Sequence, residues 1–327
     1  MIRILNVEPV GYSRDARAVL EAIGEVVEHE MDRGQLLDAI GGFDVLLVRL
    51  RHQIDRTVID RGGRLGAICS ATTGLDHIDV AYAQKQGIAI ISLKGETEFL
   101  ETIHATAEHT WALILALVRR LPAAVGSVAA GGWARERYRG RELNGKTLGI
   151  VGLGRVGGQV ARYGRAFGMN VVGYDPWRVG WPPEVTRVRD LTDLLAAADV
   201  LTLHVPLNEE TRGLLQASAF HRMNARSLLV NTSRGELVDE AALLDALRRG
   251  TIGGAALDVI AGERNPAERS LELVEYLRSH DNLIVTPHVG GATEESMART
   301  ELFIAHKLKE WLGARAAAAE VADSGMA

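Results

Sequence analysis

A glycine-rich segment followed by an acid is the part of this sequence whose residue types and spacing most clearly indicate chemistry. After an apolar run, Gly152 permits a tight turn, Gly154 lets the backbone approach a pyrophosphate, and Gly157 lets a helix pack closely on the strand. The phosphates would lie at the N-terminus of that helix. Asp175, at the end of the next apolar run, can accept hydrogen bonds from ribose hydroxyls and would repel a 2′-phosphate. The pattern predicts a dinucleotide site for NAD rather than NADP, and Arg178 is the one nearby residue that could favour NADP.

Three further segments carry polar side chains at the ends of apolar runs. They span residues 230–239, 257–263 and 285–293. Open α/β sheets bind their ligands at the carboxyl ends of the strands, so we expect these segments at one edge of a sheet. In the first segment, Arg234 offers a planar fork of donors that matches a carboxylate, which a lysine could not reproduce. These residues therefore favour a ligand that bears a carboxylate.

With these motifs the chain resembles the D-isomer-specific 2-hydroxyacid dehydrogenases over nearly its whole length, nearest the phosphoglycerate dehydrogenase-like branch without a regulatory domain. The resemblance is carried by the glycine-rich segment and by residues 204–207, 231–235, 258 with 263, and 286–288. It implies that Arg234 binds the substrate carboxylate, that His288 is the general acid/base, and that Glu263 hydrogen-bonds the other nitrogen of His288. The implied activity is a reversible hydride transfer between NAD(H) and a 2-hydroxy or 2-oxo acid.

The resemblance also implies which residues contact the ligands, with Asp258 on the nicotinamide side of NAD. The implied cofactor-binding residues are Gly152, Gly154, Arg155, Val156, Gly157, Asp175, His204, Val205, Pro206, Thr211, Thr232, Ser233, Asp258, His288 and Gly290. The implied substrate-binding residues are Arg49, Leu50, Thr73, Gly74 and Arg234. Among these, the backbone amides near Thr73 and Gly74 could bind the carboxylate. Either Arg49 or Arg135 could neutralise a second anionic group.

The chemistry of the reaction agrees with these roles. Oxidising a 2-hydroxy acid requires a base for the hydroxyl proton while hydride leaves the same carbon, and histidine titrates near working pH. A neighbouring carboxylate would keep His288 protonated for the reverse reduction. The family usually has proline directly after this acid, whereas residues 264–266, Arg-Asn-Pro, follow Glu263 here. Glu268 and Glu272 therefore stay open as alternative partners of His288.

The sequence leaves the physiological acid open. Residues 133–135, Trp-Ala-Arg, and residues 142–147 are most similar to the phosphoglycerate dehydrogenase branch, but Ser70 stands where that branch often carries an arginine. Glyoxylate, hydroxypyruvate and a phosphonate-bearing acid are the other candidates. A non-catalytic NAD-sensing binding protein of the corepressor type is the alternative function, because such proteins resemble this family and keep the same three residues. A formate dehydrogenase is disfavoured, because it has a glutamine where Glu263 stands.

Two α/β domains are needed to position these residues, and 327 residues suit that number. Buried parallel strands are predicted at residues 2–7, 45–49, 67–70 and 88–91, and then at 147–151, 170–174, 200–203, 227–231, 254–258 and 283–286. We therefore expect two Rossmann-like, doubly wound parallel sheets. An NAD-binding domain, residues 102–288, would be inserted into a smaller flavodoxin-like substrate domain made of residues 1–101 and 289–327.

Two helical segments bear on how the domains and subunits connect. Residues 101–121 are apolar on most sides and are closed by Pro122, which predicts a helix buried between domains or subunits and, through it, a homodimer. A last helix over residues 294–312 has no place in the second sheet, so we expect it to return to the first domain. The alanine-rich tail, residues 314–327, is expected to fray.

Composition disfavours several other classes of protein. A hydrophobic fraction of 47% and a net charge of -5 fit a globular enzyme and give no basic footprint for nucleic acid. Cys69 is the only cysteine, and His104, His109 and His306 have no metal-ligand spacing, so these histidines are interpreted as structural and no metal is expected. The first residues do not resemble a signal peptide, and no apolar run approaches ~20 residues. These features predict a cytoplasmic protein with no membrane association.

Overall fold

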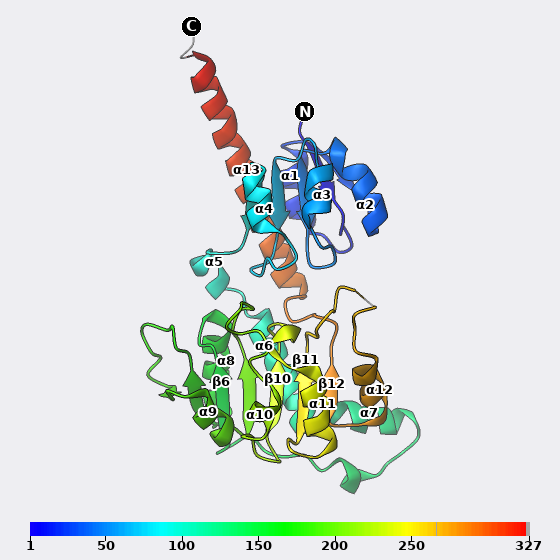
Figure 1. The fold of residues 1–327 in the computed structure, drawn as a ribbon, viewed down its shortest axis with the longest axis vertical. Coiled ribbons are helices and arrows are strands. Elements are labelled where there is room, and N and C mark those ends of the chain that lie inside the picture. Colours follow the sequence, from blue (N-terminus) through cyan, green and yellow to red (C-terminus); the bar gives the residue numbers. More distant parts are fainter. Residues whose placement is uncertain (266, 325–327) are drawn as a thin grey trace. The chain divides into compact units, whose positions relative to one another are not determined.

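The computed structural model describes residues 1–265 and 267–324, which form two compact units (Figure 1). Unit 1 consists of Met1–Thr102 together with the chain from Thr293 onward, and unit 2 consists of Ile103–Ala292. Unit 2 is therefore an insertion in unit 1. The second boundary falls after Ala292 rather than after residue 288, so the whole segment that contains His288 and Gly290 belongs to unit 2.

Unit 1 is built on a parallel sheet with the strand order β2-β1-β3-β4-β5, which is the flavodoxin-like order. Its strands are β1 (Arg3–Asn6), β2 (Glu25–Glu28), β3 (Val45–Val48), β4 (Ala67–Ser70) and β5 (Ala89–Ser92). Its helices are α1 (Arg14–Glu21), α2 (Arg33–Ala39), η1 (Ile40–Gly42), α3 (Arg56–Arg61), α4 (Val80–Lys85), α5 (Thr97–Glu101) and α13 (Glu294–Ser324). The sequence did not predict β2, because its residues, Glu-Val-Val-Glu, lie half-exposed at the edge of the sheet and make no apolar run.

Unit 2 is built on a parallel sheet with the strand order β12-β11-β10-β9-β6-β7-β8. Its strands are β6 (Thr147–Val151), β7 (Asn170–Tyr174), β8 (Thr186–Arg187), β9 (Val200–Leu203), β10 (Leu228–Asn231), β11 (Gly254–Leu257) and β12 (Leu283–Val285). The order of the strands reverses between β6 and β9, as in dinucleotide-binding Rossmann folds, where the ligand lies at that switch point. The two sheets confirm the predicted α/β fold, and β8 is a short edge strand that the sequence did not predict.

Helices cover both faces of the sheet of unit 2 (Figure 1). One face packs against α6 (Ala105–Val118) and α8 (Arg155–Ala166), and the other against α9 (Leu191–Ala197), α10 (Ala217–Phe220), α11 (Glu240–Arg248) and α12 (Leu271–Ser279). The unit also contains α7 (Leu121–Ala129) and the short helices η2 (Arg135–Tyr138) and η3 (Gly235–Leu237). With both faces covered, the central strands β9, β10 and β11 are buried throughout, and this explains their largely apolar sequences.

The predicted helix over residues 101–121 is wrong in its ends and in its surroundings. The range contains α6 but only the last residue of α5 and the first residue of α7. Pro122 lies in the first turn of α7, where its missing N–H costs nothing. Trp111 and Ile114 of α6 are buried in the core of unit 2, against β10, β11 and β12. The apolar character of this helix is thus explained by the core of its own unit and no longer indicates a subunit interface.

The last helix extends further than predicted. α13 packs on α1, β4 and β5 of unit 1, as expected, but it continues to Ser324 instead of fraying after residue 313. Alanine has the highest helix propensity, and residues 316–319 are all alanine. The remainder of the predicted frayed tail, residues 325–327, lies outside the described residues.

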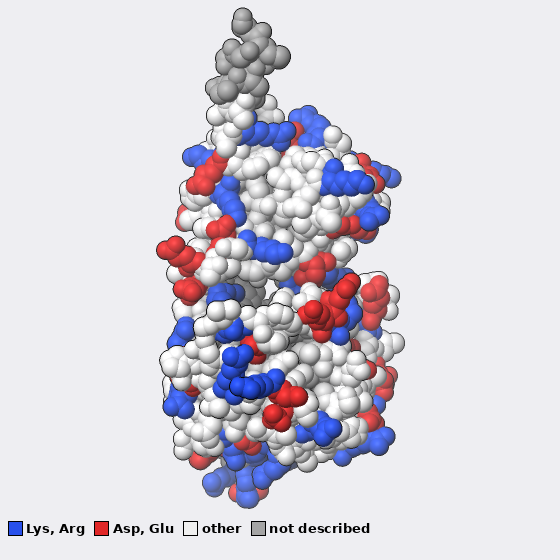
Figure 2. Space-filling model, turned by 60° about the vertical axis from the view of Figure 1, so that its left-hand side comes forward, with Lys and Arg blue, Asp and Glu red and all other residues white. Residues whose placement is uncertain are grey.

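Within residues 1–265 and 267–324, no single helix is long and apolar enough to cross a membrane. The segments Thr97–Val118 and Leu121–Ala129, bent by 64°, pass that test only when taken together. Charged side chains of both signs are interspersed on the face drawn in Figure 2, so no continuous basic surface covers that face.

Candidate active site

The glycine-rich turn has the close approach that its sequence predicts. Gly152 has a φ of +87°, and a Cβ there would lie 2.6 Å from the carbonyl oxygen of His204. A Cβ on Gly157 would lie 2.0 Å from the carbonyl oxygen of Gly152. Gly154 is the N-cap of α8 and makes no side-chain cap, so no cap side chain covers the N–H groups of the first turn. Arg155 and Val156 begin this helix, and the turn fits a pyrophosphate at its N-terminus.

Asp175 lies directly after β7 and is held to this turn. Its Oδ2 accepts a hydrogen bond of 2.9 Å from the N–H of Leu153, and its Oδ1 accepts one of 3.1 Å from the N–H of Trp177. The guanidinium of Arg178 donates to the carbonyl oxygens of Leu153 and Gly180. Asp175, which favours NAD, and Arg178, which could favour NADP, therefore both form hydrogen bonds with the backbone of Leu153 in the glycine-rich turn.

The implied cofactor residues after β9 and β10 are joined by hydrogen bonds. Ser233 Oγ donates to the carbonyl oxygen of Val205 at 2.5 Å, and Thr211 Oγ1 donates to that of Pro206 at 2.7 Å. Burial lowers the pKa of His204 to about 3, so its imidazole is neutral at working pH. Thr232 Oγ1 lies 2.9 Å from Oγ1 of Thr110 in α6. These contacts fix the two loops at the switch-point edge of the sheet.

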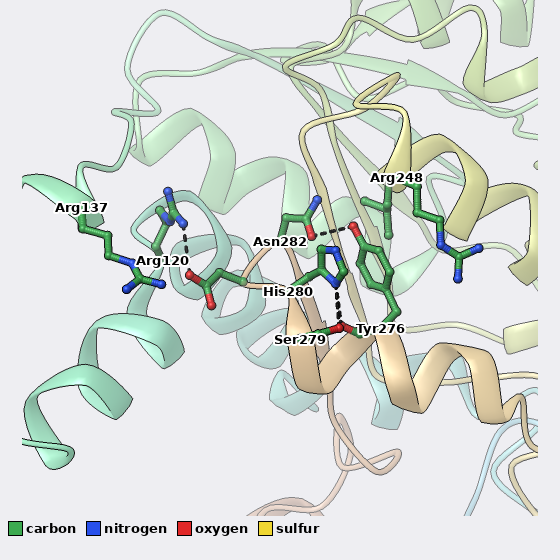
Figure 3. A pocket seen from close by; sticks show the side chains of 9 residues that line it. Arg120, Arg137, Arg248, Tyr276, Ser279, His280 and Asn282 are labelled. Atoms are coloured by element: carbon green, nitrogen blue, oxygen red, sulfur yellow. Dashed lines mark hydrogen bonds and ion pairs between the residues drawn. The ribbon is translucent and has the colours of Figure 1, made fainter.

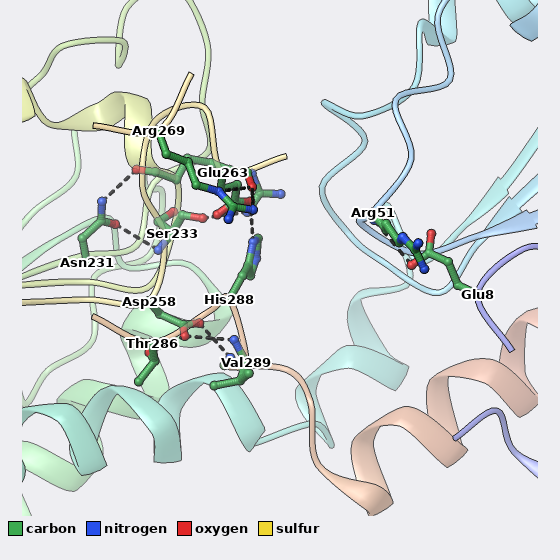
Figure 4. Close-up of polar contacts among 12 residues, drawn as sticks. Glu8, Arg51, Asn231, Ser233, Asp258, Glu263, Arg269, Thr286, His288 and Val289 are labelled. Atoms are coloured by element: carbon green, nitrogen blue, oxygen red, sulfur yellow. Dashed lines mark hydrogen bonds and ion pairs between the residues drawn. The ribbon is translucent and has the colours of Figure 1, made fainter. Parts of the chain in front are cut away.

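His288 and Glu263 are in direct contact (Figure 4). Oε1 of Glu263 lies 2.6 Å from Nδ1 of His288, and both side chains are largely buried. The other two acids left open by the sequence are engaged elsewhere, because Glu268 accepts a hydrogen bond from Asn265 and Glu272 pairs with Arg248. Among the three candidates, Glu263 is the one that contacts His288, and it does so through Nδ1 of the ring.

The loop that carries Glu263 is held at both ends. The N–H of Ala261 donates to Oε1 of Glu240 at 2.6 Å, and the Nε of Arg269 donates to the carbonyl oxygen of Glu263 at 3.0 Å. Gly235 packs so closely on this loop that a Cβ would lie 2.0 Å from the carbonyl carbon of Ile260. Pro266 lies outside the described residues. The loop therefore holds Glu263 in place even though the proline that the family usually has directly after this acid is absent here.

Asp258 fixes the backbone around His288 (Figure 4). Its carbonyl oxygen accepts from the N–H of His288 at 2.8 Å, and its carboxylate accepts from the N–H groups of Val289 at 2.9 Å and Gly290 at 2.7 Å. Burial raises the pKa of Asp258, but hydrogen bonds from His109, Thr286 and these two N–H groups outweigh it and hold the pKa below its usual value. Asp258 is therefore an ionised, buried anchor of the histidine loop, a role that the sequence did not reveal.

Arg234 lies in the loop after β10, with an extended backbone at the start of η3. Its Nη1 donates to the carbonyl oxygen of Ser233 at 2.7 Å. Asn231 shapes the loop, because its Nδ2 donates to the carbonyl oxygen of Arg234 at 2.8 Å and its Oδ1 accepts from the N–H of Ser233 at 3.0 Å. Arg234 thus follows β10, next to β11, after which Asp258 and Glu263 lie.

The implied substrate residues of unit 1 follow β3 and β4. Arg49 pairs at 2.5 Å with Glu301, whose side chain is 2% exposed, and the N–H of Arg49 donates to Oε1 of Glu8. Leu50 follows directly in this loop. The pairing argues against Arg49 as the ligand of a second anionic group, because its charge is already balanced by a buried carboxylate. The Oε2 of Glu8 also accepts from the N–H of Arg51 at 3.4 Å (Figure 4).

Thr73 and Gly74 lie in the turn after β4. The hydroxyl of Thr72 donates to the carbonyl oxygen of Gly74 at 2.8 Å and bonds Ser70 Oγ at 2.8 Å. The side chain of Thr73 is exposed. The turn is therefore fixed by its own threonine, and its backbone amides are at the carboxyl edge of the sheet of unit 1, where ligands of such sheets bind.

A cavity of about 330 Å³ elsewhere in unit 2 contains none of these residues (Figure 3). It is lined by side chains that include Arg120, Arg137, Arg248, Tyr276 and His280. Acids balance two of its arginines, since Arg120 pairs with Asp281 at 3.2 Å and Arg248 with Glu272 at 2.7 Å. Among the described residues, no group of three or more His, Cys, Asp or Glu side chains could hold a metal ion.

The fold and the site define a class of protein: a Rossmann unit that carries an arginine and a histidine–carboxylate pair at the carboxyl edge of its sheet. Residues 111–290 match the family model "D-isomer specific 2-hydroxyacid dehydrogenase, NAD binding domain". The D-3-phosphoglycerate dehydrogenase of Methanocaldococcus jannaschii is 39% identical over 316 residues, 95% of this chain and 58% of that protein. The hydroxypyruvate reductase of Thermotoga maritima is 35% identical over 289 residues, 88% of this chain and 91% of that protein.

A solved structure is similar along almost the whole chain. It is the crystal structure of D-lactate dehydrogenase from Aquifex aeolicus complexed with NAD and lactic acid, with a TM-score of 0.83, 28% identity and coverage of 95% of this chain and 96% of that one. The chain belongs to the D-isomer-specific 2-hydroxyacid dehydrogenase family, and unit 2 contains the NAD-binding domain of that family. The family predicted from the motifs is thereby confirmed. The chain spans only 51–58% of the length of three D-3-phosphoglycerate dehydrogenases that it matches.

Proposed function

We propose that this protein is an NAD-dependent D-2-hydroxyacid dehydrogenase. The observation that carries the proposal is the 2.6 Å contact between His288 Nδ1 and Glu263 Oε1, at the edge of a Rossmann sheet where such ligands bind. The glycine-rich turn supports NAD as the cofactor, because its tight geometry lets the backbone approach a pyrophosphate. A side chain at Gly152 or Gly157 would clash with the backbone and prevent that geometry. When bound, NADH supplies a hydride and NAD accepts one.

The residues of the chain would handle the proton and the carboxylate. In the reduction, a protonated His288 donates its Nε2 proton to the carbonyl oxygen of the 2-oxo acid as hydride reaches the same carbonyl carbon. In the oxidation, neutral His288 accepts the proton of the hydroxyl group. Glu263 supplies the counter-charge of the imidazolium through Nδ1, and Arg234 binds and aligns the carboxylate of the substrate.

We propose a short 2-oxo acid as the substrate, with phosphoglycerate-like acids as the first candidates, because the chain is 39% identical to a D-3-phosphoglycerate dehydrogenase. The neutralised charge of Arg49 weakens this choice. So does the position of the exposed Arg135, because its segment meets the amino-terminal edge of the sheet of unit 2, where Arg141 donates to the carbonyl oxygen of Arg226. A panel of 3-phosphohydroxypyruvate, hydroxypyruvate, glyoxylate and pyruvate, monitored by NADH absorbance, ranks these acids by kcat/KM.

The decisive variant is His288→Ala. We expect a loss of roughly 10²–10⁴-fold in kcat with NADH binding nearly intact, because proton transfer is lost and the nucleotide turn is untouched. His280→Ala, in the separate cavity of α12, is the matched control and should keep native turnover. Native turnover by His288→Ala would refute the mechanism. A wild-type protein that binds NADH and reduces no 2-oxo acid would instead support the NAD-sensing alternative.

We also propose a homodimer, formed through α7 and the segment after it. Helix α7 has no buried residue, and Val125, Val128 and Trp133 are 66%, 53% and 88% exposed. Apolar side chains gathered in this way favour association with another subunit. Light scattering at micromolar concentration should give the mass of two chains, and Val125→Glu with Val128→Glu should give one. Leu271→Glu, an exposed apolar residue of α12, is the control, and a monomeric wild type would refute the proposal.

We further infer a cytoplasmic location. The inference is supported by the need of an NAD-linked oxidoreductase for a cellular pool of NAD(H), which is a charged molecule that does not cross membranes freely. Cys69, the single cysteine, is buried in β4 and is compatible with a reducing compartment. Cell fractionation followed by an NADH-linked assay tests this location.

A further inference from the structure

His109, which belongs to none of the motifs, lies against the carboxylate that anchors the histidine loop. Its Nε2 is 3.1 Å from Oδ1 of Asp258 and 3.1 Å from Oγ1 of Thr286. The side chain is 19% exposed and projects from α6, which packs on β11 and β12, the two strands that lead to these partners. The ring is thus held by packing next to the site and is not a freely moving surface histidine.

The direction of these hydrogen bonds follows from which groups can donate. Asp258 is ionised, so its carboxylate only accepts. Thr286 has one hydroxyl proton and donates it to Oδ1 of Asp258 at 2.6 Å. The proton between His109 and this pair must therefore be on Nε2 of His109, which donates to Asp258 Oδ1 and shares the donation with Thr286 Oγ1.

The loop that Asp258 holds needs such support. His288 has a φ of 54°, in the left-handed region that residues other than glycine rarely adopt. Surrounding contacts must maintain that conformation, and Asp258 provides three of them, to the N–H groups of His288, Val289 and Gly290. A Cβ on Gly290 would lie 2.9 Å from Asp258 Oδ2 and 3.6 Å from Cδ2 of His109, so this loop packs on both side chains.

We infer that His109 is a positioning residue for His288. By donating from Nε2 it fixes the orientation of the Asp258 carboxylate, and the carboxylate fixes the backbone from which the imidazole of His288 projects. The imidazole then keeps Nδ1 on Glu263 and directs Nε2 to the substrate. The consequence for turnover rests on the proposed dehydrogenase function, whereas the consequence for the loop does not.

Two substitutions separate the hydrogen bond from packing. His109→Leu removes the donor, and we expect kcat for 2-oxo acid reduction to fall about 10- to 100-fold, because a displacement of about 1 Å at the reacting group has effects of that order. His109→Gln keeps an amide donor near the position of Nε2, and kcat should stay within about threefold of wild type. His104→Leu is the matched control, because His104 is an exposed histidine at the start of the same helix, bonded to Tyr163.

Hydrogen exchange gives a readout that does not depend on turnover. In His109→Leu the backbone amides of Val289 and Gly290 should exchange about tenfold faster than in the wild type, while His109→Gln and His104→Leu should protect them as the wild type does. Wild-type exchange and wild-type kcat in His109→Leu would overturn the inference. Equal losses in His109→Leu and His109→Gln would also overturn it, because packing rather than the donor would then explain them.

The two proposals can fail separately. If the wild-type protein reduces no 2-oxo acid, the proposed function fails, and the exchange rates of Val289 and Gly290 still decide whether His109 holds the loop. If the wild type is active and exchange in His109→Leu is unchanged, the inference about His109 fails and the proposed function stands.

Discussion

Glu263 Oε1 lies 2.6 Å from Nδ1 of His288, and the two residues reach this contact from loops after neighbouring parallel strands, β11 and β12. Each loop is anchored independently of the contact. Glu240 and Arg269 hold the loop of Glu263, and Asp258 holds the loop of His288. The pair is therefore preorganised by the protein, and its orientation does not require a ligand.

The role of Glu263 is tested by the pH dependence of Glu263→Gln. The glutamine can still bond Nδ1 but carries no negative charge, so the imidazolium that donates the proton in the reduction loses its counter-charge. The alkaline limb of the kcat/KM profile for reduction should move to lower pH. Glu268→Gln is the control and should keep the wild-type profile. An unchanged profile in Glu263→Gln would assign the role to another acid.

Substitutions of Arg234 should separate charge from geometry. Arg234→Ala removes the charge-assisted contacts to the substrate carboxylate, so KM for the 2-oxo acid should rise steeply and kcat should fall. Arg234→Lys keeps the positive charge but lacks the planar fork, and its KM should lie between those of wild type and Arg234→Ala. Steady-state kinetics measures both constants. A KM in Arg234→Ala equal to that of wild type would exclude Arg234 from carboxylate binding.

Cofactor choice should depend on Asp175. Because its carboxylate would repel a 2′-phosphate, we expect NAD to be preferred over NADP by at least ~10-fold in kcat/KM. Asp175→Ala should narrow this ratio. Arg178→Ala, which removes the neighbouring guanidinium, should preserve or widen it. Comparable turnover of the wild type with both cofactors would contradict the assignment.

The ion pair of Arg49 and Glu301 should act on stability. Arg49→Leu leaves a buried carboxylate without its partner, so we expect a loss of about 3 kcal/mol in the free energy of unfolding. Adding Glu301→Leu should recover much of that loss. Arg51→Leu breaks only the exposed pair with Glu30 and should cost less than about 1 kcal/mol. Urea unfolding compares the variants, and a stable Arg49→Leu with a raised KM would restore Arg49 as a substrate ligand.

Glu240 should make stability depend on pH. Burial raises its pKa, the hydrogen bond from Ala261 opposes this, and the nearby Glu236 and Asp239 add to the rise. In the window between the ordinary pKa of a glutamate and this raised value, the folded state binds more protons than the unfolded state. The contribution of Glu240 is therefore fully present below the window and is lost as pH rises through it. Glu240→Gln keeps an acceptor for the N–H of Ala261, so its unfolding free energy should fall less than that of wild type as pH rises through this window.

Much of the fold can be predicted from local apolar runs in the sequence. The predicted bounds of three strands, residues 147–151, 170–174 and 200–203, agree with β6, β7 and β9, because strands covered on both faces are largely apolar. The two strands that the sequence missed, β2 and β8, lie at sheet edges, where one side is exposed and no such run is required. The glycine-rich turn is also determined by local sequence, since the tight turn, the close approach of the backbone and the start of α8 all fall within a few residues.

Only the tertiary structure decided which side chains meet. The sequence left Glu263, Glu268 and Glu272 open as partners of His288, and the choice depends on how a loop between two parallel strands returns to the sheet edge. It also gave no sign that His109 of α6 would reach Asp258, 149 positions further along the chain, or that Arg49 would be neutralised by Glu301, 252 positions away. Periodicity records whether a residue faces a core, but the pairing of polar groups depends on chain segments that packing brings together over such separations.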